Sequence, residues 1–299
     1  MELCHIKDDV HYVPGAVNIG VIAGQDGQAI LIDSGIGDHS GRQILQLLAS
    51  RGLRPVAILN THGHGDHVGG NAYIVERSGA KVYAPLLDSV ILQYPVWGTL
   101  FLFGGAEPIQ ELAVPRYSPR PCTPDVLVTD GEYDIAGMHI RAIPLPGHTG
   151  GHTGYLVEDV LFSGDTLASE QELNDRRVVY AYSITKRLES LKRLQGLSCA
   201  WYLLSHDIPR RDIGELVTRN IAQVEDTLRF ILGYLANSPA EANDILDALC
   251  QRYDIHLRHL RDYSLLSLTA FAYLSHLHNS GEIAYAIEGY RLRWCISRT

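Results

Sequence analysis

The strongest constraint on the fold is a short apolar segment that runs directly into a cluster of metal-binding side chains. Residues 56–60 (VAILN) are followed by THGHGDHVGG at positions 61–70. The cluster contains His62, His64, Asp66 and His67, with a glycine after each of the first two histidines. Imidazole and carboxylate are the usual ligands of a borderline metal such as zinc, and open α/β folds place ligands at the carboxyl ends of strands. The segment therefore predicts a buried strand that ends at a metal-binding loop.

The two glycines also suggest more than one metal ion. They let the backbone turn tightly, so that alternate side chains can point to two different places. Four ligands this close together can then serve two ions, although they cannot complete both coordination shells alone. Further donors are therefore expected elsewhere in the chain.

Three such donors follow three later apolar segments, in order along the chain. They are His148 in PGHT, Asp165 in SGDT and His206 in SHD, and each stands beside a glycine or a small residue. Structural histidines in turns are the alternative interpretation. Three donors placed in the same way after the first cluster favour a shared metal centre instead.

Alternating strand and helix patterns predict a layered α/β domain built from two similar halves. A hairpin is predicted from residues 17–23 and 29–33, turned at Gln25-Asp26-Gly27. Strands are also expected at 56–60, 81–84, 130–136, 138–144, 153–157, 160–163 and 199–204, and helices at 36–51, 71–78 and 184–194.

Residues 85–124 break this alternation with seven prolines. A segment this long with so many prolines is not regular throughout, and long irregular segments in compact domains are usually lids or binding loops. Its apolar side chains predict a lid over an apolar or acyl-bearing small molecule. The alternative is a proline-rich surface loop that has no functional role. The side chains in question are Tyr94, Trp97, Leu100, Phe101, Leu102 and Phe103.

Near residue 212 the alternating strand and helix patterns give way to long helical patterns. This change predicts two domains, 1–211 and 212–299. A long helix is expected at 215–235, and a capping box at Ser238-Pro239-Ala240-Glu241 predicts a second helix that runs to about residue 252. A third helix at 264–278 is followed by alternating apolar residues on both sides of Glu288-Gly289. Helices followed by a hairpin are typical of a winged-helix-like module.

Composition narrows the class of protein. The chain has 299 residues, a formal charge of -9 and a pI of about 5.8, which argues weakly against general nucleic-acid binding. Its five cysteines are scattered and odd in number, which favours a reducing cytosol. The first residues show no apolar region typical of a signal peptide, and no apolar run approaches a membrane span. A cytoplasmic protein is therefore expected.

At the metal-binding motifs the chain resembles the metallo-β-lactamase superfamily, whose HxHxDH motif is followed by a later histidine, an aspartate and a last histidine. Here these are THGHGDH, PGHT, SGDT and SHD, in that order. The resemblance covers about residues 10–235. It implies an α/β fold, a four-layered αβ/βα sandwich of the metallo-β-lactamase type, with the helical, winged-helix-like domain appended.

The resemblance also implies a ligand set. One ion would lie on His62, His64 and His148, the second on Asp66, His67 and His206, with Asp165 as the bridge. Asp33 would support the ligands by hydrogen bonding, and His152 would orient a ligand rather than bind metal. The last motif departs from the common glycine-rich form, since Ile208 and Pro209 follow Asp207. The histidines at 5, 11, 39, 139, 256, 259, 276 and 278 show no ligand pattern.

A paired centre of this kind predicts hydrolysis. Two divalent ions, zinc first, with iron or manganese as alternatives, would share and polarise one water, so that hydroxide attacks a carbonyl or phosphorus. Asp66 and Asp165 are the expected catalytic residues, and Asp66 could also relay a proton. The layout resembles glyoxalase II-like hydrolases and the winged-helix-appended branch, although no basic glutathione-binding pair is identified.

The first hypothesis is therefore hydrolysis of a small-molecule ester, thioester or lactone. The alternatives are a metal-dependent (ribo)nuclease, guided by basic residues of the tail such as Arg291 and Arg293, a non-haem iron persulfide oxygenase, and a binding role in which the metal site only senses. A small-molecule partner is expected, without a membrane, with nucleic acid as the less favoured partner and a homodimer as an option.

Overall fold

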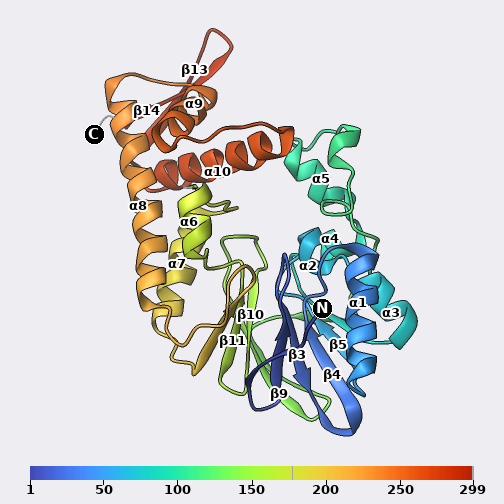
Figure 1. Cartoon of the computed structure of the whole chain (residues 1–299). Coiled ribbons are helices and arrows are strands. Elements are labelled where there is room, and N and C mark those ends of the chain that lie inside the picture. The colour runs from blue at the N-terminus through green and yellow to red at the C-terminus, as the bar shows by residue number, and fades with distance from the viewer. Residues whose placement is uncertain (177, 298–299) are drawn as a thin grey trace.

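Two β-sheets packed face to face form the body of the protein, and helices cover their outer faces (Figure 1). The structure is a computed structural model and describes residues 1–176 and 178–297. Residues 298–299, which end the predicted second domain, lie outside the described residues. The predicted four-layered αβ/βα sandwich is confirmed.

The first sheet has seven strands in the order β1-β2-β3-β4-β5-β6-β7. The first four pair antiparallel and the last four pair parallel, so β4 belongs to both patterns. The strands are β1 (Cys4–Lys7), β2 (Val10–Val13), β3 (Ile19–Ala23), β4 (Gln28–Ile32), β5 (Arg54–Leu59), β6 (Lys81–Pro85) and β7 (Val126–Val128). The predicted hairpin of β3 and β4 is confirmed, with a short 3-10 turn, η1 (Gln25–Gly27), between them.

The second sheet has five strands in the order β12-β11-β10-β9-β8. The strands β8 to β11 pair antiparallel, and β12 joins β11 in parallel. Their bounds are β8 (Gly131–Ile135), β9 (Met138–Pro144), β10 (Thr153–Val157), β11 (Val160–Gly164) and β12 (Trp201–Leu204). Because β9, β11 and β12 all run in the same direction, their carboxyl ends meet at one edge of this sheet.

Three apolar clusters hold the four layers together. Between the sheets, residues such as Ile30, Leu59 and Phe162 are almost completely buried. The outer face of the first sheet packs on α1 and α3, and that of the second on α7 and α8. Burial of so much apolar surface is the main stabilising term in folding. The helices of this part are α1 (Gly37–Ser50), α2 (Gly65–Val68), α3 (Asn71–Ser78), α4 (Ser89–Gln93), α5 (Val96–Leu102), η2 (Gln110–Leu112), α6 (Glu170–Arg176) and α7 (Ile184–Gln195).

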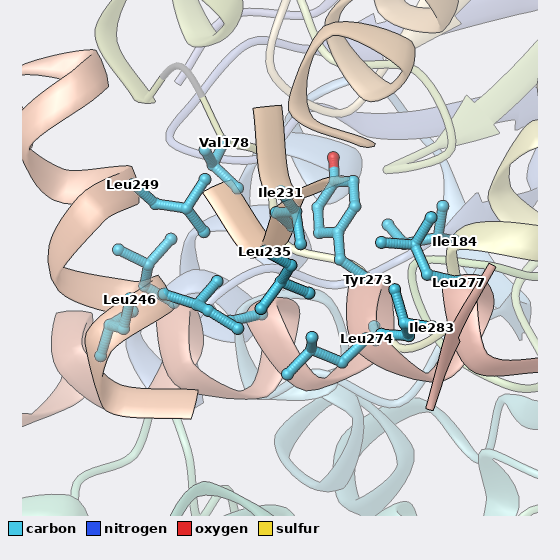
Figure 2. Packing of buried hydrophobic residues seen from close by; sticks show 14 of the residues in the cluster. Val178, Ile184, Ile231, Leu235, Leu246, Leu249, Tyr273, Leu274, Leu277 and Ile283 are labelled. Atoms are coloured by element: carbon cyan, nitrogen blue, oxygen red, sulfur yellow. The ribbon is translucent and has the colours of Figure 1, made fainter. Parts of the chain in front are cut away.

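The C-terminal part comprises α8 (Gly214–Asn237), α9 (Ala242–Tyr253), α10 (Leu260–Asn279) and the hairpin of β13 (Ile283–Glu288) and β14 (Arg291–Ile296). Its apolar cluster also includes Val178, Ala181 and Ile184, so this core is shared with the chain that precedes α8. Figure 2 shows Tyr273, Leu274 and Leu277 of α10 packed against residues of α8 and α9. In Figure 1, α10 crosses above the sheets and its first turns lie beside α5.

The predicted capping box at residue 238 is wrong, and α9 begins later than expected. Glu241 is the N-cap residue, and it exchanges hydrogen bonds with Asp244. The reason is tertiary: the N–H and C=O of Ala240 both pair with Trp294 of the hairpin, at 3.0 and 2.8 Å. Residue 240 is therefore held in an extended bridge and cannot start a helix. The order of three helices followed by a hairpin is as expected, while the winged-helix assignment stays a prediction.

Within the described residues, no helix has both the length and the apolar character needed to cross a membrane.

Candidate metal centre

All seven predicted ligands lie at strand ends that meet where the two sheets come together. His62 and His64 follow β5 of the first sheet, and α2 carries Asp66 and His67. In the second sheet, His148 follows β9, Asp165 follows β11 directly and His206 follows β12. Hydrogen bonds join the two edges, because the Thr153 N–H donates to the Thr61 carbonyl at 2.8 Å and the Tyr155 hydroxyl donates to the Asn60 carbonyl at 2.9 Å.

Three imidazoles converge on one side of the centre. His62 Nε2 lies 3.0 Å from His64 Nδ1, and His148 Nε2 lies 3.0 Å from that same His64 nitrogen. The three ligand atoms all lie within 4.8 Å of one another. Nitrogen lone pairs that point at one place in this way are arranged as they would be around a tetrahedral metal.

Asp165 stands between this group and the histidines on the other side. Its Oδ2 is 3.4 Å from His148 Nε2, whereas its Oδ1 is 3.5 Å from Nε2 of both His67 and His206. His62, His67 and Asp165 form a second group within 4.8 Å. The carboxylate thus faces both sides of the centre, which is the position that a bridging ligand requires.

The residues present fit a metal. His67 Nε2 and Asp165 Oδ1, which face each other at the centre, are buried and have no hydrogen-bond partner among the described residues. Buried polar atoms are nearly always satisfied, so orphaned ones at one place point to a bound group. Burial also lowers the pKa of His62 and of His148 well below the usual imidazole range. Both rings are therefore neutral, which is the form that binds metal.

On the other side of the centre, the pKa of the histidine is shifted in the opposite direction. Burial acts against a charged His67, but the carboxylates of Asp165 and Asp33 hold its pKa well above the usual value. Burial likewise opposes ionisation of Asp165, while His67 and His206 lower the pKa of that carboxyl well below its usual range. The ionised Asp165 therefore supplies negative charge at the centre.

Asp33 orients two parts of the ligand loop, as expected. Its Oδ2 accepts from His67 Nδ1 and from the Thr61 hydroxyl, both at 2.8 Å, and its Oδ1 accepts from the Thr61 N–H at 2.8 Å. The bond to Nδ1 leaves Nε2 of His67 facing Asp165. Such partners fix the orientation of a ligating histidine.

His152 contacts Asp165 through the backbone. Its Nε2 accepts a hydrogen bond from the Asp165 N–H at 2.9 Å, and its Nδ1 lies 3.1 Å from the Thr166 hydroxyl. Burial lowers the pKa of His152 to about 3, so the ring stays neutral. Gly164 has φ +56°, and a Cβ there would lie 2.4 Å from the same Nε2, so only glycine fits between them. The ring therefore fixes Asp165 and is not grouped with the ligand atoms.

Asp88 is a supporting residue that the sequence did not single out. It is 2% exposed, and its Oδ1 and Oδ2 accept from the N–H groups of Gly63 at 2.9 Å and Gly151 at 2.7 Å. One carboxylate thus joins the loop of His62 and His64 to the loop of His148. An acidic residue soon after the end of β6 is the same strand-end signal that identified the ligands, and it could have revealed Asp88.

Asp66 is paired with an arginine from the Pro-rich segment. Arg116 donates to Asp66 Oδ2 at 2.8 Å, and the arginine side chain is 41% exposed. The backbone of this segment packs directly on the ligand loop, since a Cβ at Gly65 would lie 2.3 Å from the Arg116 carbonyl oxygen. The segment therefore reaches the centre itself, and it places a cation beside one predicted ligand.

A cavity of about 600 Å³ opens onto the centre. His64, Asp66, His148, Asp165 and His206 line one end of it. The remaining walls come from α4, α5, the segment at Arg116 and Tyr117, the side chains of Asp175, Val178 and Tyr180, and the C-terminal part at 254–257 and α10. This volume lies within the range of small-molecule sites.

The predicted lid contributes only some of the side chains expected of it. Phe101 and Leu102 of α5 line the cavity, whereas Trp97 is outside its lining, 44% exposed, with its ring centroid 6.2 Å from that of Phe101. Tyr180, which the sequence did not suggest, also lines the cavity, and its ring centroid lies 5.2 Å from that of His148. Burial raises the pKa of Tyr180 to about 12, so its hydroxyl stays protonated.

Comparisons with known proteins agree on one family. The sequence model of the metallo-beta-lactamase superfamily matches residues 12–206. A hydroxyacylglutathione hydrolase from Xylella fastidiosa (strain M23) is 32% identical over 183 residues, which are 60% of this chain and 55% of the relative. The chain spans about half the length of the curated relatives it matches.

Two solved structures share the fold along almost the whole chain. A beta-lactamase domain protein from Burkholderia ambifaria has a TM-score of 0.77 at 20% identity and covers 99% of this chain and 94% of its own. A metallo-beta-lactamase family protein from Thermus thermophilus has a TM-score of 0.72 at 23% identity, with coverage of 96% and 97%. At this identity the likeness extends to the fold alone.

Proposed function

Because the chain belongs to the metallo-beta-lactamase superfamily, we propose that it is a metal-dependent hydrolase of a small-molecule ester, thioester or lactone. The observation that carries the proposal is the joint placement of neutral, converging imidazoles and an ionised carboxylate at the end of one cavity. A Ser-His-Asp nucleophile is not needed for such a reaction. The thioester is the preferred member of the class, since the similar hydroxyacylglutathione hydrolases act in name on such a compound.

In this proposal the ligands divide between two ions, most favourably zinc. His62, His64 and His148 hold one ion, and Asp66, His67 and His206 hold the other, with Asp165 between them. When bound, the ions supply hydroxide at neutral pH and stabilise negative charge on the attacked group.

The protein's own residues have separate tasks. Asp33 and His152 orient His67 and Asp165, and Asp88 holds the two ligand loops together. Asp66 accepts a hydrogen bond from Arg116 through Oδ2, which leaves Oδ1 as the oxygen that would bind the second ion. The cavity walls exclude bulk water and hold the organic part of the substrate.

The basic residues of the tail argue against a nuclease. Arg291 pairs with Glu241 at 3.1 Å, and Arg252 pairs with Asp226 at 2.9 Å. These carboxylates neutralise two of the arginines that would otherwise be available to RNA phosphates. A persulfide oxygenase on the same scaffold would require iron, which elemental analysis detects.

The proposal retains the two-domain division at residue 212, with a winged-helix-like second domain. Five free cysteines support the prediction of a reducing compartment. A homodimer stays a prediction.

The test is a substrate panel offered to the purified, zinc-supplemented protein: a lactone, a thioester, bis-p-nitrophenyl phosphate and a structured RNA. Turnover of the thioester or lactone, with slow or no cleavage of RNA, is expected. Rapid RNA cleavage with inert carbonyl substrates would overturn the proposal.

A further inference from the structure

Helix α10 has two apolar faces with different surroundings. One face, with Tyr273, Leu274 and Leu277, belongs to the core of the C-terminal part (Figure 2). The other face carries Leu265 and Leu268, which lie in the lining of the cavity and in no core cluster of the described residues. Residues three and four positions apart share one side of a helix. Arg261, Leu265 and Leu268 therefore form one stripe facing the cavity.

Apolar side chains face this stripe across the cavity. Ile91 of α4 and Phe101 and Leu102 of α5 line the opposite side, and they too lie outside the core clusters of the described chain. Phe101 is 55% exposed although it is large and aromatic. Apolar surface left open in a concave site is characteristic of ligand binding.

The apolar walls are continuous with the metal centre. The same cavity is lined by His64, His148 and Asp165 at one end and by Leu265 and Leu268 of α10. A substrate whose reacting carbonyl lies at the ligands would therefore extend its apolar part between α5 and α10. The cavity and the centre form one site.

The charged groups on the α10 wall are already paired. Arg261 donates to Asp262 at 2.7 Å, and although burial opposes its charge, Asp262 and Tyr117 raise the pKa of its guanidinium. This wall therefore has no free cation at Arg261 for an anionic head group, and its leucines provide the exposed contact surface. Both leucines are half-buried and line the cavity.

We propose that α10 and α5 form a binding subsite for the acyl chain of the substrate, so that the C-terminal part selects substrates by the length of an apolar acyl group. This inference rests on the proposed function for the reaction, but binding of the chain does not depend on turnover. Each methylene buried in such a subsite should raise kcat/KM by about fourfold until the subsite is full. The stripe of Leu265 and Leu268 sets that limit.

The test uses the full-length, zinc-supplemented protein and acyl thioesters of two, four, six, eight and ten carbons. Wild type should prefer the longer chains. Leu265→Trp and Leu268→Trp, which fill the subsite, should shift the optimum by at least two carbons toward shorter chains. If either leucine variant fails to fold, Phe101→Trp is measured in its place. Phe101 lies on the facing and more exposed wall, and its replacement by tryptophan should cause the same shift.

Phe271→Trp is the matched control. It adds a similar bulk to the same helix, but Phe271 is 49% exposed and does not line the cavity. Its chain-length profile should equal that of wild type. Circular dichroism and thermal melting report whether each variant is folded.

Calorimetric binding of octanoate separates failure of the subsite from failure of the reaction. Octanoate binding that is weakened at least tenfold by Leu268→Trp and unchanged by Phe271→Trp supports the subsite, even where no thioester is hydrolysed and the proposed function fails. Thioester turnover with equal rates for all chain lengths, and octanoate binding unaffected by Leu268→Trp, would overturn the subsite while the hydrolase stands.

Discussion

The two ends of the cavity are built in opposite ways. At the metal end, each side chain that we assign as a ligand has nearby polar or ligand groups that fix its direction, as Asp33 does for His67 and the Ala16 carbonyl does for His206 at 2.7 Å. At the other end, Leu265, Leu268 and Phe101 line the cavity with apolar side chains, which cannot form hydrogen bonds that would fix their direction. The positions of the side chains are therefore tightly fixed at the metal end and loosely fixed at the apolar end.

This difference shows which part of the site fixes chemistry and which part can vary. Hydrogen-bonded ligands tolerate little movement, since a displacement of about 1 Å can cost a hundredfold in rate. Apolar walls tolerate changes of volume, because dispersion contacts are individually small. We expect substitutions at the metal end to change the rate by orders of magnitude and those at the apolar end to change preference among substrates.

The largest effect is expected from His64→Ala. His64 Nδ1 lies 3.0 Å from the nitrogens of both His62 and His148, so its loss opens that group of ligands. Turnover should fall by at least about 10³-fold, since outer partners of ligands alone are worth about 10–100-fold. Steady-state kinetics and circular dichroism measure the effect.

His139→Ala is the control for this variant, because His139 is exposed and pairs with Glu132 and Asp134 far from the ligand loops in the fold. If His64→Ala kept more than a tenth of wild-type turnover, His64 would not be a metal ligand.

The next effect is expected from Asp88→Asn. The amide keeps the shape of the carboxylate but replaces one acceptor with a donor, so it cannot accept from both the Gly63 and Gly151 amides. Metal affinity should fall by about 10–100-fold, as measured by competition with a chromogenic chelator. Asp226→Asn, which removes a carboxylate bonded to Arg252 in the C-terminal part, should leave the affinity unchanged. An equal loss in both variants would mean that general destabilisation is responsible.

A smaller effect is expected from Arg116→Gln, at the junction of the two ends. The ion pair with Asp66 is partly exposed, and such pairs contribute about 0–1 kcal/mol. We expect kcat/KM to change by less than about tenfold and to lose part of its dependence on ionic strength. A loss as large as that of His64→Ala would make Arg116 part of the metal end. Arg120→Gln, on the same segment but paired with Asp38 and Glu76, is the control.

The smallest effect is expected from Trp97→Ser, which tests the apolar end. Trp97 is outside the cavity lining and 44% exposed, and surface substitutions of this kind usually change stability by about 0.5 kcal/mol or less. The acyl-chain profile should match that of wild type, in contrast to the profile of Phe101→Trp. A shifted optimum would show that the lid reaches further over the substrate than the structure places it.

The same contrast explains what the sequence could predict. The ligand loops can be predicted from the sequence because each donor follows an apolar strand beside a small residue. His152 and Asp33 can be predicted because they lie within recognisable motifs. The alternation of apolar residues predicted most strands of the sandwich, but not β2 or the edge strands β1 and β7. These features depend on neighbours in the sequence.

The parts that the sequence missed depend on distant neighbours. The start of α9 is set by Trp294, and the cavity is completed by Leu265 and Leu268, which read as ordinary positions of an amphipathic helix. The Asp66–Arg116 pair joins residues 50 positions apart. A single sequence gives no signal for such pairings, because nothing local distinguishes a leucine facing a cavity from one facing a core.

The most direct test of the account is elemental analysis of the purified full-length protein, with His148→Ala measured in parallel. Because the proposed centre is paired, we expect about two equivalents of divalent metal per chain in the wild type and about one equivalent or less in the variant. A wild-type protein that binds no divalent metal, or a His148→Ala protein that still holds two equivalents, would contradict it.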